Sequence, residues 1–282
     1  MTSRLFTALS LLAAAAGHAD GSWAGAKIMS ELAAKARDQA RFEVQELLHA
    51  GRAAAPVRDQ GGENVTLATF DHAKGTTFSW RAMNDPVMGG RSHSTFAVEG
   101  SEGHFKGTCA VVPFLKAPGF CKVGTQRSLV FSAPHFADAS RFIDGALLLE
   151  VETSTPEYGG FKVAFGAKGA KRPGGAVHHS PPSFKAGFKV PGKGRTVVRV
   201  PFSSFSVDWS DYTGRCDTKD PRDGFQHHCC SAEHPEVCPG AEHLAEITGL
   251  ELWAEGVAGD FDIKIASIAA GPLEAPLKPL LV

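Results

Sequence analysis

The stretch that decides the fold is Trp80-Arg81-Ala82-Met83-Asn84-Asp85-Pro86-Val87-Met88-Gly89-Gly90-Arg91-Ser92. Its Asn-Asp-Pro segment is typical of a turn, because Asn and Asp bond nearby backbone groups and proline fixes φ. Its Gly-Gly pair allows either a positive φ or a close backbone approach that a Cβ atom would block. We therefore predict a tight loop from Asn84 to Ser92, with a strand over 92–98 after it.

The loop is expected to be structural first and a binding surface second. We expect Trp80 to be buried beneath it, where an aromatic ring contributes a large apolar area. Asp85 should accept hydrogen bonds from local backbone amides rather than face a substrate, so Asp85→Asn should keep the fold. Gly90→Val should destabilise by more than about 1 kcal/mol.

Short apolar runs broken by glycine and proline fill the chain after about residue 65. Of the 282 residues, 43% are hydrophobic, and 31 Gly and 17 Pro supply many turns. Turns at such short spacing predict a β-sandwich or barrel. The expected strands span 66–70, 76–80, 92–98, 104–112, 126–132, 145–153, 160–165, 184–190, 196–201, 249–254 and 260–269.

Eight positions of the opening stretch carry a family resemblance: Trp80, Asn84, Asp85, Val87, Met88, Gly89, Gly90 and Ser92. Over roughly residues 70–270 the chain resembles the complex I intermediate-associated protein 30 family. The resemblance implies a mainly β, galactose-binding-like jelly-roll β-sandwich, which we place at 64–271. It also implies an assembly factor or chaperone of respiratory complex I or related membrane complexes, without a cofactor.

The N-terminal part has the pattern of a targeting segment followed by a helix. Residues 1–19 combine a positive start, an apolar block and small residues before the expected cleavage point, which is typical of a secretory signal peptide. A mitochondrial presequence is the alternative, although such segments are Arg-rich and amphipathic. Residues 20–63 predict a helix outside the sandwich and a linker, and 272–282 form a tail.

The signal peptide indicates a lumenal or extracellular protein, whereas the family resemblance implies a mitochondrion. In a secretory lumen, Asn64 would lie in a usable glycosylation sequon. No apolar run reaches the roughly 18 residues that a membrane span needs, so no transmembrane segment is expected.

Six cysteines are expected to form disulfides in an oxidising compartment. Cys109 and Cys121 are predicted to pair across a hairpin. Where the family usually has Gly-Gly-Phe-Ala-Ser, this chain has residues 118–122, and this difference introduces Cys121. The other four lie in a polar insertion, 208–243, where bonding of the two adjacent cysteines would be strained. Cys216 would then pair with one of Cys229 and Cys230, and Cys238 with the other.

A zinc site is the rival interpretation of the insertion. Four histidines are interleaved with its cysteines, and zinc accepts both ligand types. The paired Cys-x2-Cys spacing is missing, and cysteines in an oxidising lumen bond with each other first. We therefore expect no metal. The histidines are His227, His228, His234 and His243.

Charge is unevenly distributed along the second half of the chain. Residues 158–207 have nine basic and no acidic side chains, and 208–262 have thirteen acidic and three basic ones. The favoured interpretation is that these halves lie side by side and neutralise each other. The alternative is a basic face for an anionic partner, with Lys168, Lys171 and Arg172 as its best part. A net charge of −1 gives no general attraction to nucleic acid.

The sequence favours a binding protein over an enzyme. It contains no nucleophile elbow, no phosphate-binding Gly loop before a helix and no His-Glu-x-x-His segment. A protein client is the main expectation. The alternative is a carbohydrate-binding module, in which Trp209 and Tyr212 of the insertion would stack on sugar rings. An exposed Trp209 would support that alternative and a buried one would argue against it.

Overall fold

The computed structural model describes residues 64–85, 90–112, 117–126, 135–174, 181–220 and 224–274. These residues belong to one compact unit, Ala55–Val282. The predicted signal peptide, helix and linker lie outside the described residues, as do most of the tail and Val87, Met88 and Gly89 of the opening stretch.

The first of two antiparallel sheets has the strand order β11-β8-β15-β4-β3, with β1 also pairing with β15. A bulge in β15 separates Ile265, which pairs with β4 as well as β8, from Ser267, which pairs with β1 and β8. β15 therefore pairs with both β4 and β1 along the same edge, one on each side of the bulge. The strands are β11 (Thr196–Pro201), β8 (Ala146–Thr153), β15 (Gly259–Gly271), β4 (Glu102–Cys109), β3 (His93–Glu99) and β1 (Val65–Thr69).

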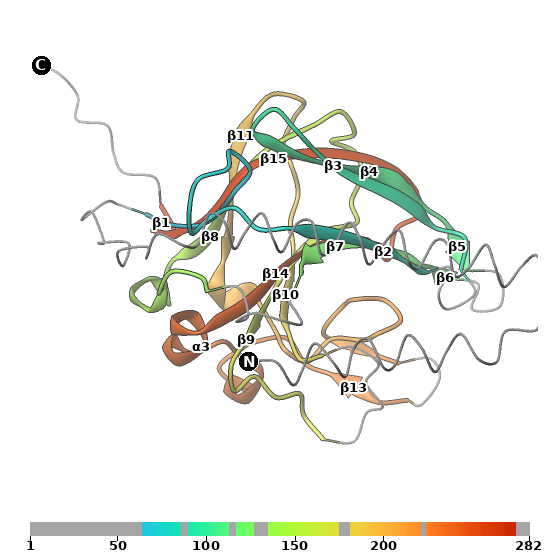
Figure 1. The fold of residues 1–282 in the computed structure, drawn as a ribbon. Coiled ribbons are helices and arrows are strands. Elements are labelled where there is room, and N and C mark those ends of the chain that lie inside the picture. The colour runs from blue at the N-terminus through green and yellow to red at the C-terminus, as the bar shows by residue number, and fades with distance from the viewer. Residues whose placement is uncertain are drawn as a thin grey trace, which may run out of the picture. The chain divides into compact units, whose positions relative to one another are not determined.

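The second sheet has the order β10-β9-β14-β7-β2 and is also antiparallel. Figure 1 shows the two sheets as stacked layers, with β2 and β3 as edge strands of different sheets. The strands are β10 (Phe184–Gly187), β9 (Phe161–Ala167), β14 (Ile247–Glu255), β7 (Phe120–Thr125) and β2 (Trp80–Asn84).

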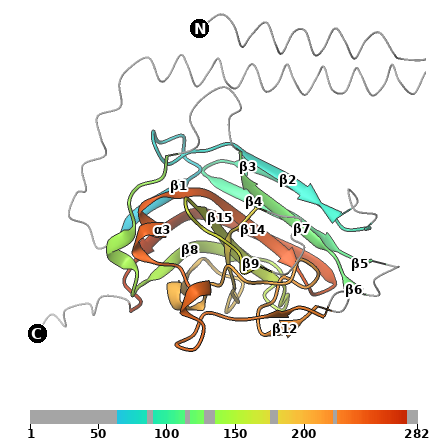
Figure 2. The same ribbon diagram turned by 90° about the horizontal axis from the view of Figure 1, so that it is seen from below.

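Smaller elements lie at the ends and on the outside of the sandwich. The ribbon of β5 (Val111–Val112) and β6 (Ala117–Pro118) and the helix α3 (Ala241–Ala245) lie at opposite ends (Figures 1 and 2). The insertion also contains β12 (Thr218–Lys219), β13 (Gln226–His227) and the 3-10 helix η4 (Pro235–Val237). Two further 3-10 helices are η2 (Ser140–Phe142) and η3 (Phe202–Ser204).

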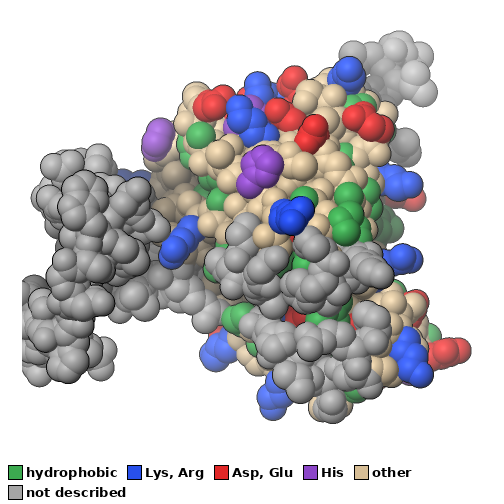
Figure 3. Space-filling model, turned by 90° about the vertical axis from the view of Figure 1, so that its right-hand side faces the viewer, with side chains coloured by type: hydrophobic (Ala, Val, Ile, Leu, Met, Phe, Trp, Pro, Cys, Tyr) green, Lys and Arg blue, Asp and Glu red, His purple; other side chains and the backbone are tan. Residues whose placement is uncertain are grey.

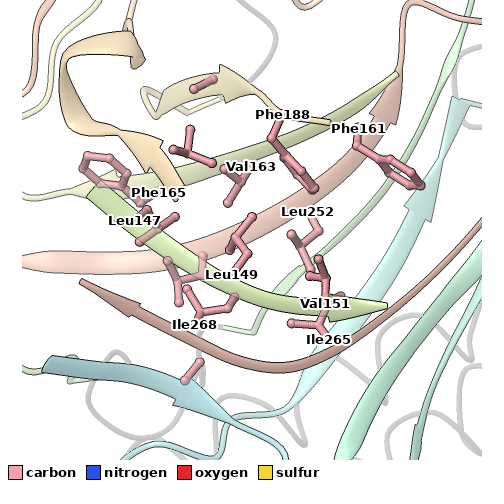
Figure 4. Packing of buried hydrophobic residues seen from close by; sticks show 14 of the residues in the cluster. Leu147, Leu149, Val151, Phe161, Val163, Phe165, Phe188, Leu252, Ile265 and Ile268 are labelled. Atoms are coloured by element: carbon pink, nitrogen blue, oxygen red, sulfur yellow. The ribbon is translucent and has the colours of Figure 1, made fainter. Parts of the chain in front are cut away.

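The core is formed by alternate residues of both sheets, as the two-residue period of a strand requires. Leu147, Leu149 and Val151 of β8 meet residues of β9 such as Val163 and Phe165 across the sandwich (Figure 4). All five are 1% exposed or less. The predicted mainly β jelly-roll sandwich is therefore confirmed.

One predicted strand is displaced along the chain, and one observed strand was not predicted. The strand expected at 76–80 lies at Trp80–Asn84, and β7 forms at Phe120–Thr125, whereas nearly all of the strand expected at 126–132 lies outside the described residues. β7 pairs on both sides, with β14 and with β2. This pairing outweighs the weak strand preference of its glycine and lysine, because β propensity depends on tertiary context.

Candidate functional site

Asp85 is the centre of a buried hydrogen-bond cluster that we call the inter-sheet staple, formed by Asp85, Ser92 and Phe120. The Asp85 carboxylate accepts the Ser92 backbone N–H at 2.8 Å, the Ser92 hydroxyl at 2.6 Å and the Phe120 N–H at 3.2 Å. Asp85 is 3% exposed and Ser92 is fully buried. Because Ser92 precedes β3 and Asp85 follows β2, the staple joins the two sheets. The prediction that Asp85 binds backbone amides is confirmed.

Glycine is required at two positions beside the staple, because the backbone there passes too close to the Asp85 side chain to leave room for a Cβ atom. A Cβ atom at Gly90 would lie 2.1 Å from the Asp85 carboxyl carbon, and one at Gly119 would lie 1.5 Å from Asp85 Oδ2. Real Cβ atoms essentially never come this close to another heavy atom. Gly90 is not among the residues with positive φ, so space rather than backbone conformation excludes a side chain there.

Trp80 does not lie where the sequence predicted. It begins β2, whereas the loop follows the other end of that strand, and its side chain is half-buried. Its ring packs against Phe70, with centroids 5.5 Å apart, and Phe96, at 6.0 Å. The expectation of full burial was therefore wrong, and residues 86–89 of the loop expected to cover Trp80 lie outside the described residues. At the loop end, the Asn84 amide shares a hydrogen bond with the Ser94 hydroxyl of β3.

The four cysteines of the insertion form two disulfides. Cys216 bonds to Cys229 and Cys230 bonds to Cys238. This resolves the two arrangements that the sequence left open. It also takes all four sulfurs away from the zinc alternative, because a disulfide sulfur is not a thiolate ligand. Among the described residues, no group of three or more His, Cys, Asp or Glu side chains could hold a metal ion.

The predicted Cys109–Cys121 disulfide is wrong, since both cysteines are free and buried. They belong to β4 and β7, which lie in different sheets rather than in one hairpin. Each thiol instead donates to a backbone carbonyl, Cys109 to Gly119 at 3.1 Å and Cys121 to Thr108 at 3.7 Å. Burial raises the pKa of Cys109 to about 11 and that of Cys121 to about 12, so neither forms a thiolate at neutral pH.

A second polar cluster lies on the outer side of the second sheet, beneath the insertion. Strand alternation points Phe161, Val163 and their neighbours inward, and sends the intervening side chains outward. The resulting covered face consists of Lys162, Lys185, Trp253 and Glu255, which are all largely buried. Figure 1 shows β13 of the insertion on the side of this sheet that faces away from the first sheet.

Lys185 is the most enclosed member of the covered face. Its Nζ lies 3.5 Å from the ring centroids of both Trp209 and Trp253, and 2.8 Å from Glu255 Oε2. Burial lowers its pKa to about 8, although the nearby Glu255 carboxylate opposes the shift. The cation is thus held between two indole rings and one carboxylate, an arrangement that cation–π attraction favours most when water is excluded.

Glu255 is shared between two cations. Lys162 Nζ lies 3.3 Å from Glu255 Oε2 and also donates to the Thr213 backbone carbonyl of the insertion at 3.0 Å. Burial alone would raise the pKa of Glu255, but the ammonium groups of Lys185 and Lys162 outweigh it and lower that pKa. The carboxylate therefore stays ionised where it is buried.

Arg172 extends the cluster on the insertion side. Its guanidinium carbon lies 3.8 Å from the centroid of the Trp209 ring, and Nη1 lies 3.0 Å from Asp211 Oδ1. On the opposite side, Lys122 Nζ lies 4.6 Å from the Trp253 centroid and 3.0 Å from Glu251 Oε1. Cations and indole rings therefore alternate across the outer side of the sheet, in the order Arg172, Trp209, Lys185, Trp253 and Lys122.

These contacts agree with the interpretation that the basic and acidic halves lie side by side. Cations of the basic segment pair with acids of the later one, through Arg172–Asp211, Lys185–Glu255 and the exposed Lys168–Glu246 pair at 2.6 Å. Arg172 does not belong to an exposed anion face, because its side chain is buried and paired with Asp211, whereas Lys168 and Lys171 are exposed and their role in such a face stays a prediction. Figure 3 shows acidic and basic side chains interspersed over the upper part of one face.

The insertion is held from within by a buried histidine between two aspartates. His227 Nδ1 lies 2.6 Å from Asp208 Oδ1, and Nε2 lies 2.9 Å from Asp220 Oδ2. Asp208 also accepts the His228 N–H, and Asp220 accepts the Ser210 hydroxyl. Burial alone would lower the pKa of His227, but the hydrogen bonds to both aspartates outweigh it and raise that pKa.

The candidate sugar-stacking residue Trp209 is buried, with 2% exposure. Its indole N–H donates to the Ser183 carbonyl at 2.8 Å, and its ring meets Trp253 edge-on at a centroid distance of 6.0 Å. Trp209 therefore has no free face for a sugar, and the stacking prediction is wrong for this residue. Tyr212 is half-buried, and its backbone N–H donates to the Ser210 hydroxyl.

Sequence reasoning counted Lys162 and Lys185 as basic residues and missed their orientation, and it did not single out Trp253, Glu255 or Asp211. A signal was present, since each strand of the covered face places a charged or aromatic residue between two core residues. Asn64, the predicted glycosylation residue, is exposed just before β1, and its modification stays a prediction. Within the described residues, the structure has no helix that is long and apolar enough to span a bilayer.

Comparison with solved structures finds distant matches. A family 11 carbohydrate-binding module from Clostridium thermocellum, solved with a β-1,3-1,4-mixed-linked tetrasaccharide, is 12% identical with a TM-score of 0.39. The match covers 76% of this chain and 99% of that chain. PfGH50B is 13% identical with a TM-score of 0.35, over 70% of this chain and 23% of that chain. These values are too low to carry any argument about function.

Comparison with curated proteins gives no significant match. The model of one protein family, described as complex I intermediate-associated protein 30, matches residues 68–216. This range is more than half of the chain and includes both the staple and the start of the insertion. The chain belongs to the complex I intermediate-associated protein 30 family.

Proposed function

We propose that this chain is a non-enzymatic binding protein whose client is another protein, in the manner of an assembly factor or chaperone. The family membership carries the proposal, because the family name itself describes association with intermediates of complex I. Fold alone would not support a function, since one fold hosts many.

The geometry around Asp85 supports a non-enzymatic role. A catalytic carboxylate needs a substrate or a second reacting group within reach. The two Asp85 oxygens instead accept three hydrogen bonds from Ser92 and Phe120, in a buried position. The most distinctive loop of the sequence therefore serves the fold, which leaves molecular recognition as the proposed activity.

The proposed place of action is the lumen of the secretory pathway or the outside of the cell, with the mitochondrion as the alternative. Two disulfides support an oxidising compartment, where such bonds persist. Carbohydrate binding remains the alternative function, although the burial of Trp209 counts against the residue first expected to stack on a sugar.

The test is capture of partners by the tagged full chain, with cross-linking in cells and identification by mass spectrometry. Gly90→Val serves as the control bait, because its loss of stability should raise the unfolded fraction and so report contacts that any unfolded chain makes. A defined protein enriched on the parent but not on the control supports the proposal. A glycan array that gives specific binding, with no protein enriched over the control, would overturn it in favour of the carbohydrate alternative.

A further inference from the structure

We propose that the covered face is a docking site for a short turn-forming peptide segment of a client, and that the insertion occupies this site as a built-in competitor. The segment would carry an aromatic residue and, two positions later, a carboxylate. This inference rests on the proposed protein-binding function and names the surface and the chemistry of the partner.

The covered face has the composition of an interface rather than of a core. Lys185 and Glu255 are at most 3% exposed, and the Lys162 side chain is 11% exposed. A buried ion pair loses much of its Coulomb energy to desolvation, and apolar residues of similar volume stabilise a protein as well or better. Aromatic and cationic side chains are instead the groups that dominate binding energy at protein interfaces. The chemistry of this face thus fits recognition better than stability.

The insertion shows which groups the face accepts. Within residues 209–213 it places the Trp209 indole against Lys185, the Asp211 carboxylate against Arg172 and the Thr213 carbonyl against Lys162. The segment is a turn, closed by backbone hydrogen bonds from Ser210 to Arg215 and from Gly214 to Ser210.

Charge favours an acidic partner segment at the same place. Among the described residues of the sheet side, the face and its rim hold four cations, Lys122, Lys162, Lys185 and Arg172, against the two carboxylates of Glu251 and Glu255. One added carboxylate, which Asp211 now supplies, compensates part of the excess. A client segment with the same aromatic and acidic groups would make the same contacts once the insertion moved aside.

The experiment uses the full chain and a fluorescein-labelled peptide with the sequence of residues 207–215, followed by fluorescence anisotropy. Trp209→Ala/Asp211→Asn should weaken the internal competitor and leave the face intact. We expect this variant to bind the peptide at least tenfold more tightly than the parent. Adding Lys185→Met to the variant should abolish this gain in affinity for the peptide. A control peptide with Ala and Asn at the two key positions should bind no better to the variant than to the parent.

Controls separate docking from loosening of the fold. Lys168→Met, which breaks an exposed ion pair of the same domain, should leave peptide binding as in the parent. Should Trp209→Ala/Asp211→Asn fail to fold, Cys216→Ser/Cys229→Ser gives a second way to release the insertion, with the same expected gain. The inference is overturned when a folded, opened variant binds both peptides equally or no better than the parent, or when Lys185→Met leaves binding unchanged.

Failure of this inference and failure of the proposed function give different results. If a client is captured equally by the parent, by Trp209→Ala/Asp211→Asn and by Lys185→Met, the proposed function stands but the covered face is not the docking site. If the peptide binds but no client is captured, the docking site on the covered face is supported and the proposed function is rejected.

Discussion

The inter-sheet staple and the covered face are both buried polar clusters, but they connect different parts of the molecule. The staple joins the two sheets through one carboxylate whose acceptor sites are filled by Ser92 and Phe120. The covered face joins one sheet to the insertion through ion pairs and cation–π contacts around Lys185. The first cluster joins the two layers of the sandwich, whereas the second joins one layer to the insertion, whose Val237 also belongs to the core.

This difference predicts two classes of variant. Changes at the staple should alter stability and should affect binding only through loss of the fold. Changes at the covered face should act on the insertion, and those that leave the protein folded should alter recognition.

Gly90→Val should destabilise the protein most, by about 4 kcal/mol, because overpacking against the fixed Asp85 carboxylate cannot relax within the staple. A Cβ atom there would lie 2.1 Å from the Asp85 carboxyl carbon. Urea unfolding followed by tryptophan fluorescence measures the change. Gly159→Val is the matched control, since Gly159 is exposed and its Cβ would meet no heavy atom within 4 Å. Equal losses in both variants would show that the close approach at Gly90 is unimportant.

Lys185→Met should cost about 2–3 kcal/mol, because it leaves the buried Glu255 carboxylate with Lys162 as its remaining ion-pair partner among the described residues. Adding Glu255→Gln should cost less than the sum of the two single changes. A double-mutant cycle in urea measures this coupling. Additive losses would mean that the two groups do not stabilise each other and that the covered face is not organised around this pair.

Asp85→Asn should cost about 1–2 kcal/mol, which revises the expectation that the fold is simply kept. An amide has one acceptor oxygen, whereas the carboxylate uses both oxygens to accept from Ser92 and Phe120. The amide N–H2 group would face at least one of these donors. Asp138→Asn is the control, because exposed Asp138 accepts a similar bond from the Ser140 N–H. A loss no larger than in this control would remove the special role of the staple carboxylate.

Stability should depend on pH through His227, whose folded pKa is raised. The folded protein holds this proton more tightly than the unfolded chain, so the contribution is complete below the unfolded pKa of about 6.5 and is lost as pH rises through the folded pKa. Urea unfolding of the parent and of His227→Gln, measured from pH 5 to 9, gives the difference. That difference should shrink with rising pH, and one that grows would show that the imidazolium does not stabilise the insertion.

Thiol counting should separate the cysteines without any change in stability. Under denaturing, non-reducing conditions two thiols should react, Cys109 and Cys121, and mass mapping should find Cys216–Cys229 and Cys230–Cys238. In the native protein both thiols should react slowly because they are buried with raised pKa values. Four reactive thiols in the denatured protein would show that one of the two disulfides is missing, and six would show that the insertion is not cross-linked.

The sequence predicted the scaffold better than the site for a physical reason. The role of Asp85 was predictable, because Asn-Asp-Pro followed by a Gly pair constrains backbone geometry locally. The burial of Trp209 was not, because no local pattern shows which surface an insertion covers. Cys109 and Cys121 looked like hairpin partners until the strand order placed them in different sheets.

The central claim is that the staple holds the fold while the covered face recognises a partner. Its most direct test combines thermal melting with affinity for the 207–215 peptide, in the Trp209→Ala/Asp211→Asn background. Ser92→Ala should lower Tm by about 4 °C or more and leave the peptide Kd within twofold. Lys162→Met, which removes a donor to the segment's backbone, should weaken the peptide Kd at least fivefold and change Tm less than Ser92→Ala does. The reverse pattern, with Ser92→Ala weakening the peptide at constant Tm and Lys162→Met leaving the peptide Kd unchanged, would contradict the division of roles.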